Sequence, residues 1–211
     1  MLGYLKNYPK KGYGIDPSSF QANFPSNKVE HNFNHQNDYF KEHADPRFPD
    51  TLLKELDATV FVDANHGNDS VTGKAITGTF EFVGSTPLEW GDTCQPSVQT
   101  ATRGAELNAL KKIVEHDITI RHYLRSMGVK VEQPTKIHYD NKAVVNNATE
   151  AGSILNKNYL DLACHFCREH FSADVIDASW VDGKHKLADA MTKGLGTTVC
   201  HVYMNRAMSN A

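Results

Sequence analysis

The sequence predicts an α/β fold: a five-stranded mixed sheet, with three antiparallel strands and then parallel additions, flanked by helices. Three observations predict it. Three short apolar or alternating runs follow one another between residues 58 and 90, with turn residues between them. A helical period then takes over up to residue 127. After residue 135 strand-like and helix-like runs alternate, which is typical of a sheet with parallel strands.

The first three strands are expected at Ala58–Asp63, Ala75–Val83 and Pro87–Trp90. The first run is β-branched and almost wholly apolar, as in a buried strand, and the second alternates. Turn-forming residues fill Asn65–Asp69 and Gly84–Ser85. Together these runs predict an antiparallel meander.

A long helix is expected from about Thr100 to Met127, with Gly128 as its C-cap. Its apolar residues recur at helical spacing; they are Ala105, Ala109, Leu110, Ile113 and Val114.

The remaining elements alternate between the two types of structure. They are a strand at Thr135–Asp140, helices at Lys142–Ala148 and Asn156–His170, a strand at Ala173–Trp180 and a last helix at Leu187–Lys193. This order implies a mixed sheet that is covered by helices.

The first 50 residues differ from the rest of the chain. They hold five of the eight prolines and show no sustained period. We expect an irregular linker, or the trailing end of an upstream domain, over residues 1–50, the α/β domain over 51–200, and a tail over 201–211.

Composition excludes several classes of protein. No apolar run approaches the roughly 20 residues that span a bilayer, and the first residues do not form a secretory signal, so we expect a protein that is not secreted. Four cysteines do not make a disulfide scaffold, which favours a reducing compartment. The net charge of −3 is unusual for a nucleic-acid binder, because such proteins are usually basic.

Four acidic residues stand at positions where a charge is costly or points inward. Asp63 and Asp140 end apolar strands, and the carboxyl ends of parallel strands form the ligand crevice of an α/β sheet. Glu106 shares a helix face with Leu110, so we expect it to point toward the sheet. Asp189 lies among apolar neighbours.

Carboxylates that are pushed together cannot all stay ionised without a cation, and hard divalent cations prefer oxygen ligands. Two such ions can activate a water and stabilise the leaving oxygen in phosphodiester hydrolysis. The plainer interpretation of any one of these acids is a loop-starting aspartate or a helix-edge glutamate, but all four in this order favour a metal site.

Five motifs together resemble the RNase H domain of Ty1/copia-type retrotransposon polyproteins, over about residues 57 to 198. They are Val62-Asp63-Ala64-Asn65, the run from Ser97 to Glu106, Tyr139-Asp140-Asn141, His165-Phe166-Cys167-Arg168-Glu169, and Leu187-Ala188-Asp189-Ala190-Met191-Thr192-Lys193. The opening residues, Gly3 to Pro9, resemble the segment that trails the reverse transcriptase in that family.

The resemblance implies an RNase H-like fold and a metal-dependent endonuclease that hydrolyses the RNA strand of an RNA–DNA hybrid. It implies two Mg²⁺ (or Mn²⁺) ions held by the catalytic residues Asp63, Glu106, Asp140 and Asp189, with Asp63 bridging both ions. It also implies that an upstream reverse transcriptase is a partner, and a location in the cytoplasm, within virus-like particles, or in the nucleus.

Residues near these acids are candidate substrate contacts. We assign hybrid binding to Asn141, Lys184, Lys186 and Lys193, although the two lysines beside His185 also fit an ordinary exposed loop. His185 lies four residues before Asp189 and could help product leave; the alternative is a solvated loop histidine.

One departure from the family leaves other hypotheses open. The basic run that relatives carry after the tryptophan is replaced by Gly91-Asp92-Thr93-Cys94, which weakens phosphate contacts. The alternatives are therefore a catalytically decayed module that binds nucleic acid or protein, and a purely structural connector.

The cysteines of the late helix invite a zinc interpretation, with Cys200-His201 completing the ligands of Cys164 and Cys167. Free cysteines are usually buried, so we predict that these two are packing residues and that no zinc is bound.

Overall fold

The structure, a computed structural model, describes residues 18, 26–28, 45–51, 55–67, 69–149 and 158–193. Most of the predicted linker, the predicted tail and Cys200-His201 lie outside the described residues. Within the described part of the chain, no helix is both long and apolar enough to cross a membrane.

A single six-stranded sheet forms the centre of the fold. Its order is β1-β6-β5-β2-β3-β4, with β2, β3 and β4 antiparallel and β5 and β6 parallel to β2. The strands are β1 (Ser26–Lys28), β2 (Ala58–Asn65), β3 (Ile76–Val83), β4 (Thr86–Cys94), β5 (Thr135–Tyr139) and β6 (Ile176–Val181). The prediction of a five-stranded mixed sheet with three antiparallel strands and parallel additions is confirmed.

The sixth strand, β1, is a finding that the sequence did not predict. It lies inside the segment that we expected to be irregular, and it pairs antiparallel with the edge of β6. Three residues are too few for a period-two pattern, and pairing to an edge needs only backbone groups. The chain before residue 50 therefore contributes to the sheet at this position.

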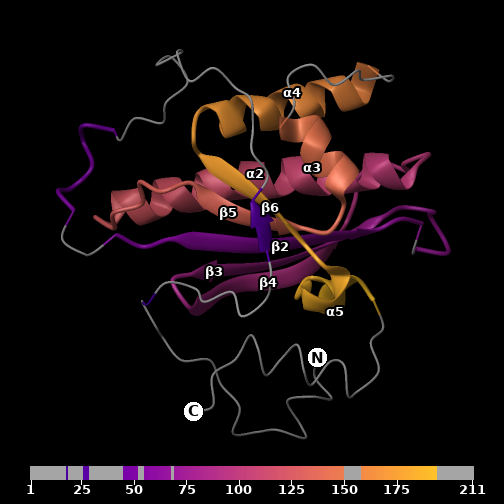
Figure 1. Ribbon diagram of the computed structural model, residues 1–211, viewed down its shortest axis with the longest axis horizontal. Coiled ribbons are helices and arrows are strands. Elements are labelled where there is room, and N and C mark those ends of the chain that lie inside the picture. The colour runs from indigo at the N-terminus through magenta and orange to yellow at the C-terminus, as the bar shows by residue number, and fades with distance from the viewer. Residues whose placement is uncertain are drawn as a thin grey trace, which may run out of the picture.

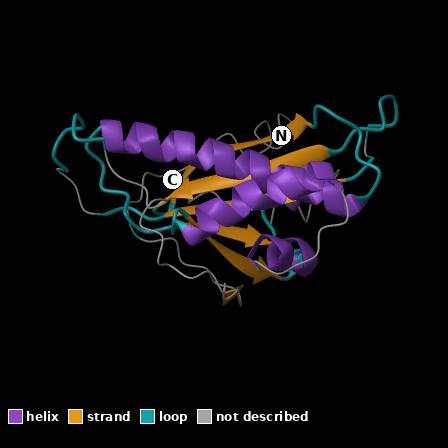
Figure 2. Ribbon diagram, turned by 90° about the horizontal axis from the view of Figure 1, so that it is seen from above, coloured by secondary structure: helices purple, strands orange, loops and turns teal. Residues whose placement is uncertain are grey.

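Helices cover both faces of the sheet (Figure 1). On one face lie α2 (Thr102–Ser126), α3 (Lys142–Thr149) and α4 (Asn158–Ser172), and Figure 2 shows the long helices running over the strands. Gly128 has a φ of +78° and caps the end of α2 as predicted. On the other face lies α5 (Asp189–Thr192), preceded by the 3₁₀ turn η2 (Gly183–His185).

Successive side chains of β2 point to opposite faces of the sheet, so β2 contributes to two separate apolar clusters. Val60 and Val62 pack with the apolar residues of α2, α3 and α4. Phe61 points to the opposite face, where it packs with Phe80, Phe82, Leu187 and Ala188. Because side chains alternate along a strand, Asp63 follows Phe61 onto the α5 face.

Gly78 on β3 allows α5 to approach the sheet next to Asp63, its partner across the β2–β3 ladder. A Cβ atom at this position would lie 2.6 Å from Thr192 Cγ2, 2.9 Å from the carbonyl oxygen of Ala188 and 2.9 Å from Met191 Cβ. Two of these three contacts are with backbone or Cβ atoms, which cannot rotate away. The missing side chain of Gly78 therefore sets the distance between α5 and the carboxylate of Asp63.

We expect Gly78→Ala to lower the free energy of unfolding by about 1–3 kcal/mol, because overpacking forces α5 off the sheet. Gly91→Ala is the matched control, since a Cβ there meets nothing within 4 Å. Urea unfolding followed by circular dichroism measures both. Equal stability of the two variants would contradict the close approach described here.

Candidate active site

Three carboxylates meet where β2 and β5 end. Asp63 lies near the end of β2, Asp140 follows β5 directly, and Glu106 projects from the first turns of α2. One carboxylate oxygen from each residue lies within 4.8 Å of the others. The structure thus brings together the two strand-end aspartates and the inward-facing glutamate, as the parallel pairing of β2 and β5 requires.

The cluster lies at the border between core and solvent. Asp63 and Glu106 are 3% and 6% exposed, whereas the Asp140 side chain is 30% exposed. A pocket of about 490 Å³ opens beside it, lined by Glu106, Asp140, Asn141, Lys142, Ala143 and Trp180. A ligand can therefore reach the carboxylates from one side.

Lys186 does not lie in an ordinary exposed loop. That was the alternative to its assignment as a phosphate contact, and its side chain is fully buried. Its Nζ donates to Asp63 Oδ1 at 2.5 Å and to Asp140 Oδ1 at 2.6 Å. The phosphate contact of Lys186 stays a prediction, and it requires the side chain to leave the carboxylates.

The electrostatics of this pairing favour the charged forms. Burial alone would raise the pKa of Asp63, but the charge and hydrogen bond of Lys186 hold it below its usual value. Burial would likewise lower the pKa of Lys186, and the attraction of Asp63 and Asp140 raises it instead. The hydroxyl of Thr192 also donates to Asp63 Oδ2, so Asp63 has a partner on both oxygens.

Glu106 behaves differently from the two aspartates. Burial raises its pKa to about 7, although the hydrogen bond from Tyr139 and the charge of Lys186 oppose the shift. The Tyr139 hydroxyl lies 2.5 Å from Glu106 Oε2 and 2.7 Å from the Glu106 carbonyl oxygen. Burial also keeps the pKa of Tyr139 well above its usual value, so the phenol remains a donor. Glu106 therefore takes up a proton more easily than Asp63, whose pKa is lowered.

Asp189, at the start of α5, is not part of the group of three. Its Oδ2 forms an ion pair with Lys193 Nζ at 2.9 Å. Its Oδ1 is buried and has no hydrogen-bond partner among the described residues. Burial raises the pKa of Asp189, and the negative charge of Asp63 adds to the shift while Lys193 opposes it. Asp189 is therefore close enough to Asp63 for their charges to interact, and its Oδ1 has no hydrogen-bond partner in the described part of the chain.

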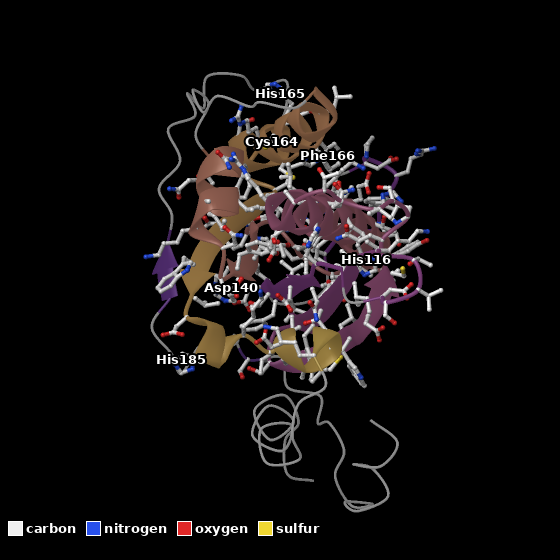
Figure 3. The ribbon with its side chains drawn as sticks, turned by 90° about the vertical axis from the view of Figure 1, so that its right-hand side faces the viewer. His116, Asp140, Cys164, His165, Phe166 and His185 are labelled. Carbon is white, nitrogen blue, oxygen red and sulfur yellow. The ribbon has the colours of Figure 1, made fainter. Side chains whose placement is uncertain are left out.

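The other predicted substrate contacts take varied positions. Asn141 lines the pocket, and its Oδ1 accepts hydrogen bonds from the backbone of Ala143 and Val144, which caps α3. Lys193 pairs with Asp189. Figure 3 shows His185 at the outer edge of the molecule, beyond the labelled Asp140. The side chain of Lys184 lies outside the described residues.

Two further pocket residues were missed. Trp180 on β6 donates from Nε1 to the carbonyl oxygen of Asp140 at 2.8 Å, and Lys142 Nζ lies 4.0 Å from the centre of its ring. Trp180 lies one residue before the end of β6, which neighbours β5. Its place at the end of the alternating run in the sequence was the available signal. The two residues give the pocket a cationic and aromatic wall.

The cysteines of α4 belong to the core. Cys164 and Cys167 are 1% and 0% exposed and pack in the larger apolar cluster. Burial raises the pKa of the Cys167 thiol, which disfavours the thiolate that zinc needs. The packing interpretation accounts for both residues; the absence of zinc stays a prediction.

No protein-family model matches the chain. Its structure is similar to the N-terminal RNase H domain of a Mycobacterium tuberculosis protein, solved as a fusion with maltose-binding protein, with a TM-score of 0.50, 15% identity, and coverage of 72% of this chain and 96% of that one. The α/β domain of the present chain therefore has an RNase H-like fold.

Two other RNase H structures are similar at lower scores. An RNase H1 from the halophilic archaeon Halobacterium salinarum has a TM-score of 0.45 and 17% identity, over 65% of this chain and 93% of that one. An RNase H1 isolated from compost has a TM-score of 0.49 and 13% identity, over 64% and 91%. We base the RNase H-like fold on the first comparison alone, and the chemistry on the residues of this chain.

The donor set of the cluster fits a hard divalent cation. All candidate ligand atoms are carboxylate oxygens, three of them already lie within 4.8 Å of one another, and Asp189 adds a buried oxygen without a hydrogen-bond partner in the described part of the chain. Mg²⁺ and Mn²⁺ prefer such ligands. The ammonium of Lys186 is the cation that this structure places between two of them.

The raised pKa of Glu106 predicts a pH dependence of stability in metal-free protein. Between the ordinary value of 4.5 and about 7, the folded protein binds more protons than the unfolded chain. The free energy of unfolding therefore falls as the pH rises through this window. We expect Glu106→Gln to remove this fall and to stabilise the protein on the order of 2 kcal/mol at pH 8 in EDTA.

Glu132→Gln is the control for this measurement, because Glu132 is 67% exposed and pairs only with a surface lysine in the described structure. Chemical denaturation at pH 5, 6, 7 and 8 gives the comparison. Parallel stability curves for wild type and Glu106→Gln would show that Glu106 titrates normally.

Proposed function

We propose that this chain is a metal-dependent endonuclease that hydrolyses the RNA strand of RNA–DNA hybrids. The observation that carries the proposal is the convergence of Asp63, Glu106 and Asp140 within 4.8 Å beside an open pocket. The RNase H-like fold supports it, because the cluster stands at the end of the central strands of that fold. The sequence motifs around the same residues point to the same activity.

Asp63, Glu106 and Asp140 would hold one divalent ion, and Asp63 with Asp189 would hold a second. Bound there, Mg²⁺ or Mn²⁺ would activate a water and stabilise the leaving oxygen of a phosphodiester. The unpaired oxygen of Asp189 supports its inclusion, although Asp189 does not belong to the group within 4.8 Å.

The chain's own residues would bind and orient the hybrid. Lys142 and Trp180 form a wall of the pocket beside Asp140, where a cation suits a phosphate and an aromatic face suits a sugar or base. We assign hybrid contacts also to Asn141, Lys184 and Lys193, and product release to His185. Recognition would then use the backbone and 2′-hydroxyls of an A-form duplex.

From the sequence motifs we further propose that the chain derives from a Ty1/copia-type Pol polyprotein. In that setting residues 1–50 would continue from an upstream reverse transcriptase, which would be the domain's partner. Co-purification of the chain with a separately expressed reverse transcriptase of such an element, lost when residues 1–25 are deleted and β1 is kept, tests this part.

One observation favours a second candidate, a catalytically decayed module that binds nucleic acid or protein. Lys186 already forms ion pairs with both Asp63 and Asp140, as in a site where an internal cation has replaced the metal. The two candidates differ in activity, which decides between them.

The deciding experiment is cleavage of a labelled RNA–DNA hybrid in Mg²⁺ and in Mn²⁺. We expect the full chain to cut the RNA strand and to leave duplex DNA intact, and Asp140→Asn to lose at least about 100-fold in rate. Glu132→Gln removes the same charge from the exposed surface and should cut like wild type. An uncut hybrid in both ions, from protein with a folded circular dichroism spectrum, would favour the decayed module.

A further inference from the structure

The ammonium of Lys186 lies where a metal ion shared by Asp63 and Asp140 would have to lie. Its Nζ is 2.5 Å from Asp63 Oδ1 and 2.6 Å from Asp140 Oδ1, and its side chain is fully buried. Tyr139 closes one side, with its ring centre 5.4 Å from Nζ. The two oxygens that Lys186 contacts belong to residues of the only group of three potential ligands that the described residues form.

The two cations exclude each other at this position. Mg²⁺ binds carboxylate oxygens at about 2.0–2.1 Å. The Lys186 ammonium lies between the two aspartates and contacts one oxygen of each. A metal ion bound by both aspartates would therefore occupy the same space as the ammonium. Like charges at such a separation also repel strongly in a partly buried site. Metal can bind Asp63 and Asp140 together only when the Lys186 ammonium has left them.

The backbone around Lys186 is fixed, so the side chain is the part that must move. The amide of Lys186 donates to the carbonyl of Gly183, and its carbonyl accepts from the amide of Asp189. The next residues, Leu187 and Ala188, are buried in the smaller apolar cluster against β2 and β3. The Lys186 ammonium can therefore leave the aspartates by a change in side-chain conformation alone. The backbone segment that carries Lys186 need not move.

We propose that Lys186 is an internal counter-ion that competes with divalent metal for Asp63 and Asp140 and so sets the metal affinity of the site. The inference rests on the proposed function only in taking the cluster as a metal site. The inference gives Lys186 a role of its own: its ammonium pairs with both aspartates and orders them before metal binds. The same pairing weakens metal binding. The metal-bound protein has the Lys186 amine outside the cluster.

A Mn²⁺ titration of the full chain tests the competition. Lys186→Met keeps the length of the side chain and removes its charge, and we expect it to bind Mn²⁺ about tenfold more tightly or better. Lys136→Met removes the same charge from a lysine that is half exposed and pairs with Asp57, away from the cluster. We expect that variant to gain about threefold or less, because it acts only through the long-range field. Electron paramagnetic resonance of free Mn²⁺ gives the affinities without an activity assay.

A second measurement uses only wild-type protein, so it survives if Lys186→Met fails to fold. Acetylation of lysines, quantified by peptide mass spectrometry, should find Lys186 protected in EDTA and reactive in saturating Mn²⁺. Lys136, which is half exposed and paired with Asp57 away from the cluster, should react equally in both conditions. Continued protection of Lys186 in protein that has bound Mn²⁺ overturns the inference.

The outcomes separate this inference from the proposed function. Equal Mn²⁺ affinity of Lys186→Met and wild type, or an equal gain in Lys136→Met, rejects the competition and leaves the nuclease proposal standing. Tighter Mn²⁺ binding by Lys186→Met, with hybrid uncut by either protein, supports the competition and rejects the nuclease. No Mn²⁺ binding by any of the three proteins rejects both.

Discussion

The pairing of one buried ammonium with two strand-end carboxylates is the interaction around which this site is organised. A folded chain can bury carboxylates together only if a positive charge or a proton compensates them. Here both solutions are used: the Lys186 ammonium donates to Asp63 and Asp140 and holds the pKa of Asp63 below its usual value, while burial raises the pKa of Glu106 to about 7. The cluster is therefore stable without metal, and it keeps the oxygen ligands that a hard cation needs.

The arrangement depends on a short segment that crosses the end of the sheet. Gly78 leaves room for α5, Leu187 and Ala188 anchor it in the smaller apolar cluster, and the side-chain amide of Asn65 donates to the carbonyl of Thr192 at 3.0 Å. This anchoring delivers Lys186, Thr192 and Asp189 to the neighbourhood of Asp63. The packing of α5 against the sheet therefore determines the electrostatics of the site. A substitution that shifts α5 also shifts the charged and polar groups around Asp63.

Hydrophobic period predicted the sheet, the long helix and the convergence of Asp63, Glu106 and Asp140, because strand ends and helix faces follow from local pattern. It could not predict β1, because three residues are too few to show an alternating pattern. It could not predict the burial of Lys186, for which a phosphate contact and an exposed loop were the two interpretations, because the burial depends on the tertiary approach of α5 to the sheet. Tyr139 and Trp180 were missed as site residues for the same reason: their partners, the Glu106 carboxylate and the Asp140 carbonyl, are set by how distant elements pack.

The central claim is that these carboxylates form a divalent-cation site from which Lys186 must withdraw. Anomalous diffraction from crystals of the full chain grown in Mn²⁺ tests it most directly. The account predicts a Mn²⁺ peak bounded by oxygens of Asp63, Glu106 and Asp140, at the place of the ammonium, with the Lys186 side chain turned away from both aspartates. Lys186 still bridging Asp63 and Asp140, with no anomalous peak at the cluster, would contradict it.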